Sequence, residues 1–253
     1  MNTAEMMEPI AEASPRLKAR VAGVLYLLIF VAAPFAEFFV RGRIVVYSDP
    51  AATARNILAH ESLFRFGFVA ELITLVCDTT VALIFYDLLK PVSKSLSLLA
   101  AFFRLMLVAI MAVDSLNYFS PLVLLSGAHF LTAFTADQLQ GLALMSQSLY
   151  THGYNISLVF FGFHCLLVGY LIYRSTFLPR IIGVLLAIGG PCYVTNSFGT
   201  FLSPGFAAPY LLIPAALGEL SLTLWLLVVG VNVQRWKEQA SVARLRSNGA
   251  AGT

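Results

Sequence analysis

Charged residues are scarce in this sequence. Only 11% of its 253 residues are Asp, Glu, Lys or Arg, and 59% are hydrophobic, whereas soluble domains carry about 25% charged residues. This shortage excludes an ordinary soluble domain. It also leaves no basic patch with interleaved aromatic residues, which nucleic-acid binding would require. We therefore expect an integral membrane protein that contacts the lipid bilayer and binds no nucleic acid.

The sequence contains only three cysteines and lacks the familiar catalytic motifs. Cys77, Cys165 and Cys192 each lie within an apolar run, which leaves neither a disulfide framework nor a C-x-x-C metal motif. The sequence contains no P-loop, H-E-x-x-H, G-x-S-x-G or dinucleotide-binding pattern. We expect no metal ion, no cofactor and no catalytic residue of a familiar type.

Long apolar stretches are what the sequence does contain. Six of them are long enough for a membrane-spanning helix, which needs about 20 residues. They cover residues 21–40, 64–89, 96–125, 150–173, 181–202 and 210–233. The predicted fold is all-α: a polytopic membrane protein with a bundle of six transmembrane helices and two short interfacial helices on the outer side.

The two interfacial helices are predicted from their capping residues. Asp49 is a candidate N-cap, and Pro50 then stands at the first position of a helix that reaches His60. Thr135 and Gln138 have the spacing of a capping box in front of a second apolar face. Both helices are interpreted as covers for the outer end of the bundle, with a gate as the less favoured alternative.

The distribution of Lys and Arg predicts the orientation. Eleven of these residues lie in the N-terminal tail, the second and fourth connections and the C-terminal tail. Only Arg41, Arg43 and Arg55 lie on the opposite side, with Arg65 at the membrane edge. Both termini are therefore expected in the cytoplasm. The predicted organisation is an N-terminal tail (1–20), a six-helix transmembrane domain (21–233) and a basic, frayed C-terminal tail (234–253).

Five charged residues fall inside the predicted membrane helices: Glu71, Asp78, Asp114, Glu219 and Arg104. A charge near the bilayer centre costs at least ~2.5 to 3.5 kcal/mol on insertion scales, so such residues face a bundle interior and mark functional sites by default. Arg104 and Asp78 lie at comparable depths in adjacent helices, which predicts an ion pair between them. The pair is either a structural tie between two helices or part of a binding site.

The acids outnumber the arginine by three, and a low-dielectric interior does not tolerate that excess. Some acids must be protonated, bind a cation or reach water. We expect Glu219 to be protonated near neutral pH, at the centre of an internal site with Glu71. His164 either completes a relay there or hydrogen-bonds between helices. The candidate internal polar site comprises Glu71, Asp78, Arg104, Asp114, His164 and Glu219.

Several short motifs resemble one family. They are Ala22–Tyr26, Leu63–Gly67, Leu88–Val92, Phe160–His164, Arg174–Arg180 and Gly218–Leu220. In this order they resemble the bacterial multi-pass membrane family catalogued as domain of unknown function 4386, from about Arg20 to Asn232. The resemblance implies a bacterial inner-membrane protein of about six helices. It supplies no catalytic or binding residues.

Three classes of function remain open. Binding or transport of a small solute, with proton coupling as one version, is favoured by the acidic interior and by Gly189-Gly190-Pro191, where a helix could break or kink. A non-catalytic membrane component or sensor with a protein partner comes second. An enzyme acting on a lipid comes last, because it would depend on His164 with Asp78 and Glu219. The sequence identifies neither the ligand nor the oligomeric state.

Overall fold

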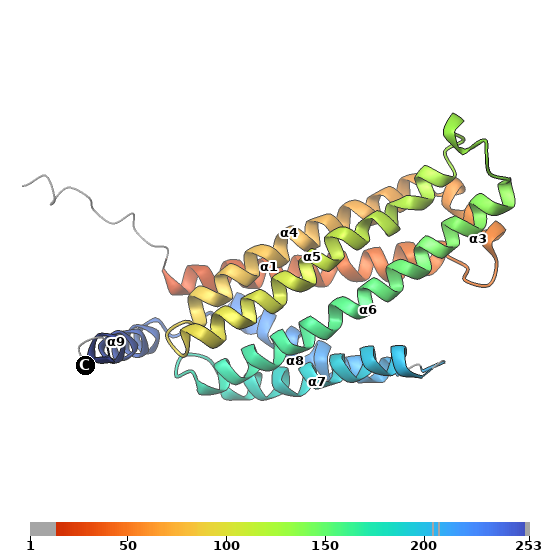
Figure 1. Ribbon diagram of the computed structural model, residues 1–253. Helices are drawn as coiled ribbons and strands as arrows, with labels where there is room; N and C mark the ends of the chain where they lie inside the picture. Colours follow the sequence, from red (N-terminus) through yellow and green to blue (C-terminus); the bar gives the residue numbers. More distant parts are fainter. Residues whose placement is uncertain (1–13, 204, 207, 251–253) are drawn as a thin grey trace, which may run out of the picture.

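The computed structural model describes residues 14–203, 205–206 and 208–250 (Figure 1). Within these residues the chain forms helices and no strand. Six helices are long and apolar enough to cross a membrane, which confirms the predicted all-α membrane fold. They are α1 with its continuation (Pro15–Ile44), α4 (Glu61–Leu89), α5 (Lys94–Leu124), α6 (Ala136–Arg174), α7 (Arg180–Leu202) and α8 (Leu212–Val228), which follows the 3₁₀ turn η4 (Pro209–Leu211).

The first membrane helix changes its winding part-way. The α-helix α1 (Pro15–Pro34) passes into a π-helix, η2 (Phe35–Arg41), and then into a short α2 (Gly42–Ile44). Pro34 has no backbone N–H and its ring crowds the preceding turn, which favours altered winding at this point. The predicted end of the helix at Val40 is therefore four residues too early, and the extra turn carries Arg41 along the bundle.

One of the two predicted short helices forms as a separate element. α3 (Pro50–Ala59) begins at Asp49, whose carboxylate accepts a hydrogen bond from the Ala52 N–H at 2.9 Å. The prediction of a second separate helix is wrong. Thr135 and Gln138 do form a capping box, but it begins α6 itself. No proline follows the box within α6, so nothing ends the helix there.

The glycine-proline sequence of α7 also leaves no break, because α7 is helical from Arg180 to Leu202. Its glycines serve close packing instead. A Cβ added to Gly169 of α6 would lie 2.6 Å from the backbone of Gly183 on α7, and one on Gly162 would lie 2.7 Å from the Gly190 carbonyl. Small residues allow membrane helices to approach closely. Two glycines on each helix therefore bring α6 and α7 into backbone contact.

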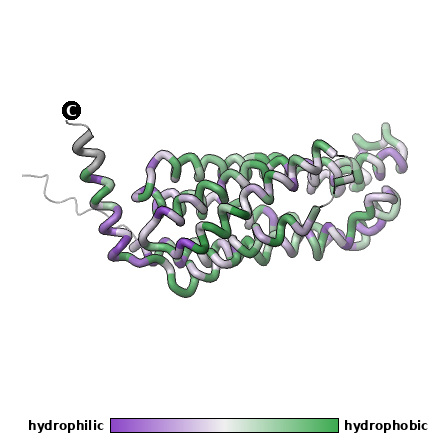
Figure 2. The backbone as a smooth tube through the Cα atoms, turned by 90° about the horizontal axis from the view of Figure 1, so that it is seen from below, coloured by the Kyte–Doolittle hydropathy of each residue, from purple (hydrophilic) through white to green (hydrophobic). Residues whose placement is uncertain are grey.

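The six membrane helices form a closed ring. Each packs against its neighbour in the order α1, α4, α5, α6, α7 and α8, and α8 packs back against α1. Figure 2 shows hydrophobic residues along the length of this bundle, with hydrophilic residues gathered towards its ends and in α9. Many large apolar side chains on the outside are exposed, among them Val76, Val113 and Leu116. Such a surface is suited to contact with lipid chains.

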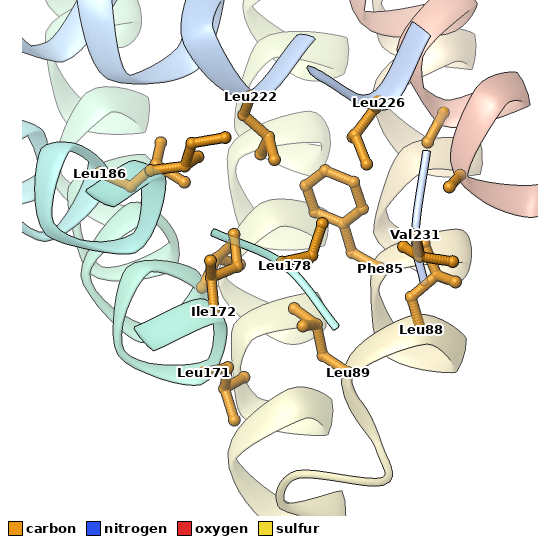
Figure 3. Close-up of a cluster of buried hydrophobic side chains, with 14 of the residues drawn as sticks. Phe85, Leu88, Leu89, Leu171, Ile172, Leu178, Leu186, Leu222, Leu226 and Val231 are labelled. Carbon is orange, nitrogen blue, oxygen red and sulfur yellow. The ribbon is translucent and has the colours of Figure 1, made fainter. Parts of the chain in front are cut away.

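Apolar side chains fill the ring at the end where α1 begins. Figure 3 shows Phe85 and Leu88 of α4, Ile172 of α6, and Leu222 and Leu226 of α8 converging there. The buried polar residues of α4, α6 and α8, which are described below, lie farther from the start of α1 than this apolar cluster does. A second apolar cluster, which includes Val40, Phe64, Tyr118 and Tyr150, lies towards the other end. Several members of this second cluster, such as Leu75 and Leu107, line the polar interior itself.

The basic C-terminal segment is more ordered than the sequence suggests. Where a frayed tail is expected, residues Val233–Ala250 form α9. Gly230, with φ of 74°, allows the chain to turn after α8. Figures 1 and 2 show α9 running across the end of the bundle at a steep angle to the membrane helices.

Candidate functional site

Arg104 of α5 lies at the centre of a buried hydrogen-bond network and has an exposure of 0%. Its Nε donates to the Asp78 carboxylate at 2.9 Å, and Nη2 donates to the same oxygen. Its Nη1 lies 2.8 Å from the Tyr26 hydroxyl oxygen and 3.1 Å from Nε2 of His164. His164 Nδ1 is 2.8 Å from the Ala100 carbonyl oxygen, which assigns the ring proton to Nδ1 and leaves Nε2 to accept from Arg104.

Aromatic rings complete the environment of this guanidinium. Its central carbon lies 4.6 Å from the centre of the Tyr26 ring, 5.5 Å from that of Phe161 and 5.9 Å from that of Phe85. These distances suit cation–π attraction, which is stronger when the cation is desolvated. The charge of Arg104 is thus paired with Asp78 inside the protein and packed against aromatic rings.

A second buried arginine was assigned by the sequence to the outer side. Arg41 is 3% exposed, and its Nη1 lies 2.5 Å from the Glu37 carboxylate one turn earlier. It also donates to Gln147 and Thr151 of α6, and its guanidinium stacks over the Tyr150 ring at 4.2 Å. Arg41 therefore belongs to the continued first helix and is buried, where the sequence predicted an exposed connection after residue 40. Its spacing of four residues from Glu37, at the end of the apolar run, could have indicated an ion pair within one continuous helix.

Three buried acids, Glu71, Asp114 and Glu219, have no basic partner among the described residues, and Glu71 and Glu219 are each held by a tyrosine. The Tyr150 hydroxyl donates to Glu71 at 2.7 Å, and the Tyr193 hydroxyl donates to Glu219 at 2.6 Å. Glu71 is 5% exposed and Glu219 is 6% exposed. The second oxygen of Glu71, Oε1, is buried and has no hydrogen-bond partner. A buried polar atom left unpaired is costly, so this oxygen is a candidate contact for a ligand.

These groups meet in one cavity of about 310 Å³ inside the ring, lined by residues from all six membrane helices. Its polar lining includes Glu37, Glu71, Asp78, Arg104 and Glu219. Its aromatic lining is Phe30, Phe38, Tyr150, Tyr154, Phe161 and Tyr193. Counting Arg41, which binds Glu37, four acids face two arginines, and the excess is two negative charges if all are ionised. The cavity is therefore acidic, and aromatic rings form part of its wall.

The structure brings together most, but not all, of the residues proposed from the sequence. Asp78 and Arg104 form the expected pair and line the cavity with Glu71 and Glu219. His164 does not line the cavity and reaches it only through Arg104. Asp114 lies outside it, where its carboxylate accepts from Asn117 at 2.8 Å. The π-helical segment that supplies Glu37 and Phe38 was not anticipated, and such segments often occur at functional sites.

Metal binding finds no support in the described part of the chain. No three His, Cys, Asp or Glu residues gather there in a way that could hold an ion. The three cysteines are free thiols, and Cys77 and Cys165 are buried. Buried thiols of this kind pack as small apolar groups.

Comparison with known proteins places this arrangement in a family. The model of the family described as Domain of unknown function (DUF4386) matches residues 21–230. The chain belongs to this family. The DUF4386 region includes every residue that lines the cavity, whereas α9 lies beyond it.

The DUF4386 chain is also similar to an uncharacterised protein of the archaeon Archaeoglobus fulgidus. The two are 30% identical over 165 residues, which cover 65% of this chain and 84% of the relative. No solved structure matches this chain significantly.

Proposed function

We propose that this protein binds a small organic cation in the central cavity, in exchange for protons on Glu71 and Glu219, and moves it across the membrane. The observation that carries this proposal is the pair of buried acids without a basic partner on one cavity. Acidic residues inside membrane proteins commonly mark ion pathways and proton relays.

The chemistry of the cavity favours a cation over an anion or a neutral solute. Both nearby arginines are engaged, Arg104 by Asp78 and Arg41 by Glu37. An anion would therefore meet two unpaired acids and two arginines that are already paired. Aromatic rings such as those of Tyr154 and Phe161 attract alkylammonium groups through their faces. A volume of about 310 Å³ is at the lower end for ligand pockets, which range from about 300 to 1,000 Å³.

Protons enter the proposal because an empty cavity must neutralise its acids. A buried carboxyl without a basic partner avoids the ionised form. In the proposal Glu71 and Glu219 are protonated when the cavity is empty, with the tyrosine hydroxyls holding one oxygen of each. A bound cation replaces these protons. An enzymatic role for His164 has less support, because Ala100 and Arg104 occupy both of its ring nitrogens.

The proposed orientation places both termini in the cytoplasm of the cell, with the protein in the inner membrane. Eleven Lys and Arg residues lie at the start of α1, in the α4–α5 and α6–α7 connections and their flanks, and after α8. With Arg41 buried in the bundle, Arg43 and Arg55 remain at the opposite side, with Arg65 at the membrane edge. Such an asymmetry is typical of membrane proteins whose basic end is cytoplasmic.

A series of three isosteric probes tests the charge of the ligand. Choline, its uncharged carbon isostere dimethylbutanol and the anion dimethylbutyrate are titrated against the detergent-purified protein, and thermal stability is recorded. We expect choline alone to raise the unfolding temperature. The effect should be larger at mildly alkaline pH than at acidic pH, since protons compete for the same carboxylates.

Substitutions in the cavity test whether choline stabilises the protein by binding there. Glu71→Gln combined with Glu219→Gln should weaken choline binding at least about tenfold, because the buried charges that pair with it are gone. The control is Glu61→Gln, which changes an exposed acid paired with Arg65 outside the cavity. If dimethylbutanol also stabilises the protein, and the same glutamates are required, then the cavity binds a neutral solute and the proposal of a cation ligand is refuted. Absence of any binding would favour a non-catalytic membrane component.

A further inference from the structure

A large basic pocket lies away from the central cavity, at the end of the bundle that carries α9. Its volume is about 1110 Å³, and it is bounded by α9, the α4–α5 connection and the α6–α7 connection. Six basic residues line it: Lys90, Lys94, Arg174, Arg180, Arg235 and Arg244. Glu238 is the single acid in the lining. The lining is therefore strongly basic, with Lys90 paired at 2.8 Å with Asp87 of α4.

Specific contacts hold α9 against these connections. The Trp236 indole donates to the Leu88 carbonyl at the end of α4 at 2.9 Å. Gln239 accepts hydrogen bonds from the backbone N–H and the hydroxyl of Thr176, at 3.1 and 3.0 Å. These bonds tie α9 to the end of α4 and to the α6–α7 connection at once. The basic residues of α9 are thereby kept opposite those at the ends of the membrane helices.

The pocket lies where the membrane helices end. α4 ends at Leu89, α5 begins at Lys94, α6 ends at Arg174 and α7 begins at Arg180. Lys94 and Arg174 are exposed, and neither makes an ion pair within the described residues. Apolar residues are also present in the lining, including the exposed Val242 of α9. Positive charge next to apolar surface at the ends of membrane helices is suited to the boundary between lipid headgroups and acyl chains.

We propose that this pocket binds the phosphate-bearing headgroup of an anionic phospholipid, with α9 lying along the membrane surface. Basic pockets at the ends of membrane helices suit such headgroups, and each basic residue near an anionic surface contributes about fivefold to affinity. A bound headgroup would bridge α9 and the two connections. The inference does not depend on the central cavity or on its ligand.

The test compares lipids that share acyl chains and differ in headgroup charge. Short-chain phosphatidylglycerol, the matching phosphatidylcholine and inorganic phosphate are titrated at constant ionic strength against the full-length protein in a mild non-ionic detergent. Thermal stability is the readout. We expect saturable stabilisation by phosphatidylglycerol and little effect of the other two.

Variants identify the site. Lys94→Gln with Arg174→Gln should weaken the apparent affinity for phosphatidylglycerol about 25-fold, which is about fivefold for each residue. Lys237→Gln is the matched control, because Lys237 is an exposed basic residue of α9 outside the pocket lining. It should bind as the unmodified protein does. Each single variant keeps the test valid if the double variant unfolds.

Three results would overturn the proposal. Equal loss of affinity in the control and the pocket variants would mean that phosphatidylglycerol acts through general surface charge. Stabilisation by inorganic phosphate at the same concentration would mean that the pocket recognises a free anion and not a lipid. A response to phosphatidylcholine as strong as that to phosphatidylglycerol would also exclude recognition of headgroup charge.

Discussion

Replacing Arg104 by methionine should destabilise the protein more than any exposed charge removal. Asp78 is 5% exposed, and Arg104 is the basic residue that pairs with it. The substitution keeps much of the side-chain volume but leaves the Asp78 carboxyl buried without its basic partner, so that it must either remain an unpaired charge or take up a proton. Breaking a desolvated ion pair in this way costs about 3 to 5 kcal/mol. The Tyr26 hydroxyl and His164 Nε2 lose their partner as well.

Unfolding in mixed detergent micelles, followed by circular dichroism, measures this loss. Asp78→Asn in the same chain removes the unpaired carboxyl and should recover at least about 1 kcal/mol of the free energy of unfolding. Arg65→Met is the matched control, since Arg65 and its partner are both about half exposed, at 51% and 47%. It should cost less than about 1 kcal/mol. If the losses from Arg104→Met and Asp78→Asn simply add in the double variant, the two side chains do not act as a unit and the reasoning fails.

Three further predictions concern packing, electrostatics and topology. Gly169→Leu should separate α6 from α7 and lower the unfolding temperature strongly, whereas Gly141→Leu should not, because nothing lies within 4 Å of a Cβ at Gly141; equal effects would contradict the packing argument. Arg41→Gln should weaken choline stabilisation less than the loss of the two glutamates does, since Arg41 binds its own acid and not the ligand; a larger loss would assign it a direct role. Reporter fusions after Gly127 and after Ser203 should both report the periplasmic side, and a cytoplasmic signal at either would refute the proposed orientation.

The helices were predictable because the bilayer imposes their length. A span of about 20 apolar residues can be read directly from a sequence, and charged residues such as Lys90 and Lys94 limit it. The α6 boundary was less accessible, because the segment after Thr135 is amphipathic and continues into the membrane helix without a break. Nothing local distinguishes a separate surface helix from the extended end of a long one. The closure of α8 onto α1 depends on packing between distant segments.

The candidate site was predictable where a charge stands alone in an apolar run. Asp78, Arg104 and Glu219 stand out for this reason, and depth alone was enough to pair the first two. Arg41 was missed because it follows the apolar run and looks like an ordinary flanking arginine. Its burial depends on the π-helical winding after Pro34 and on contacts to α6, which no local pattern encodes.

Proton release on cation binding tests the central claim most directly. The purified protein is placed in weakly buffered detergent solution near neutral pH with a pH-sensitive dye, and choline is added. The account predicts that the unmodified protein and Glu61→Gln release protons in proportion to bound choline, while Glu71→Gln with Glu219→Gln releases none. Choline binding without proton release, or equal release from the cavity variant, would contradict exchange of a cation for protons at these two glutamates.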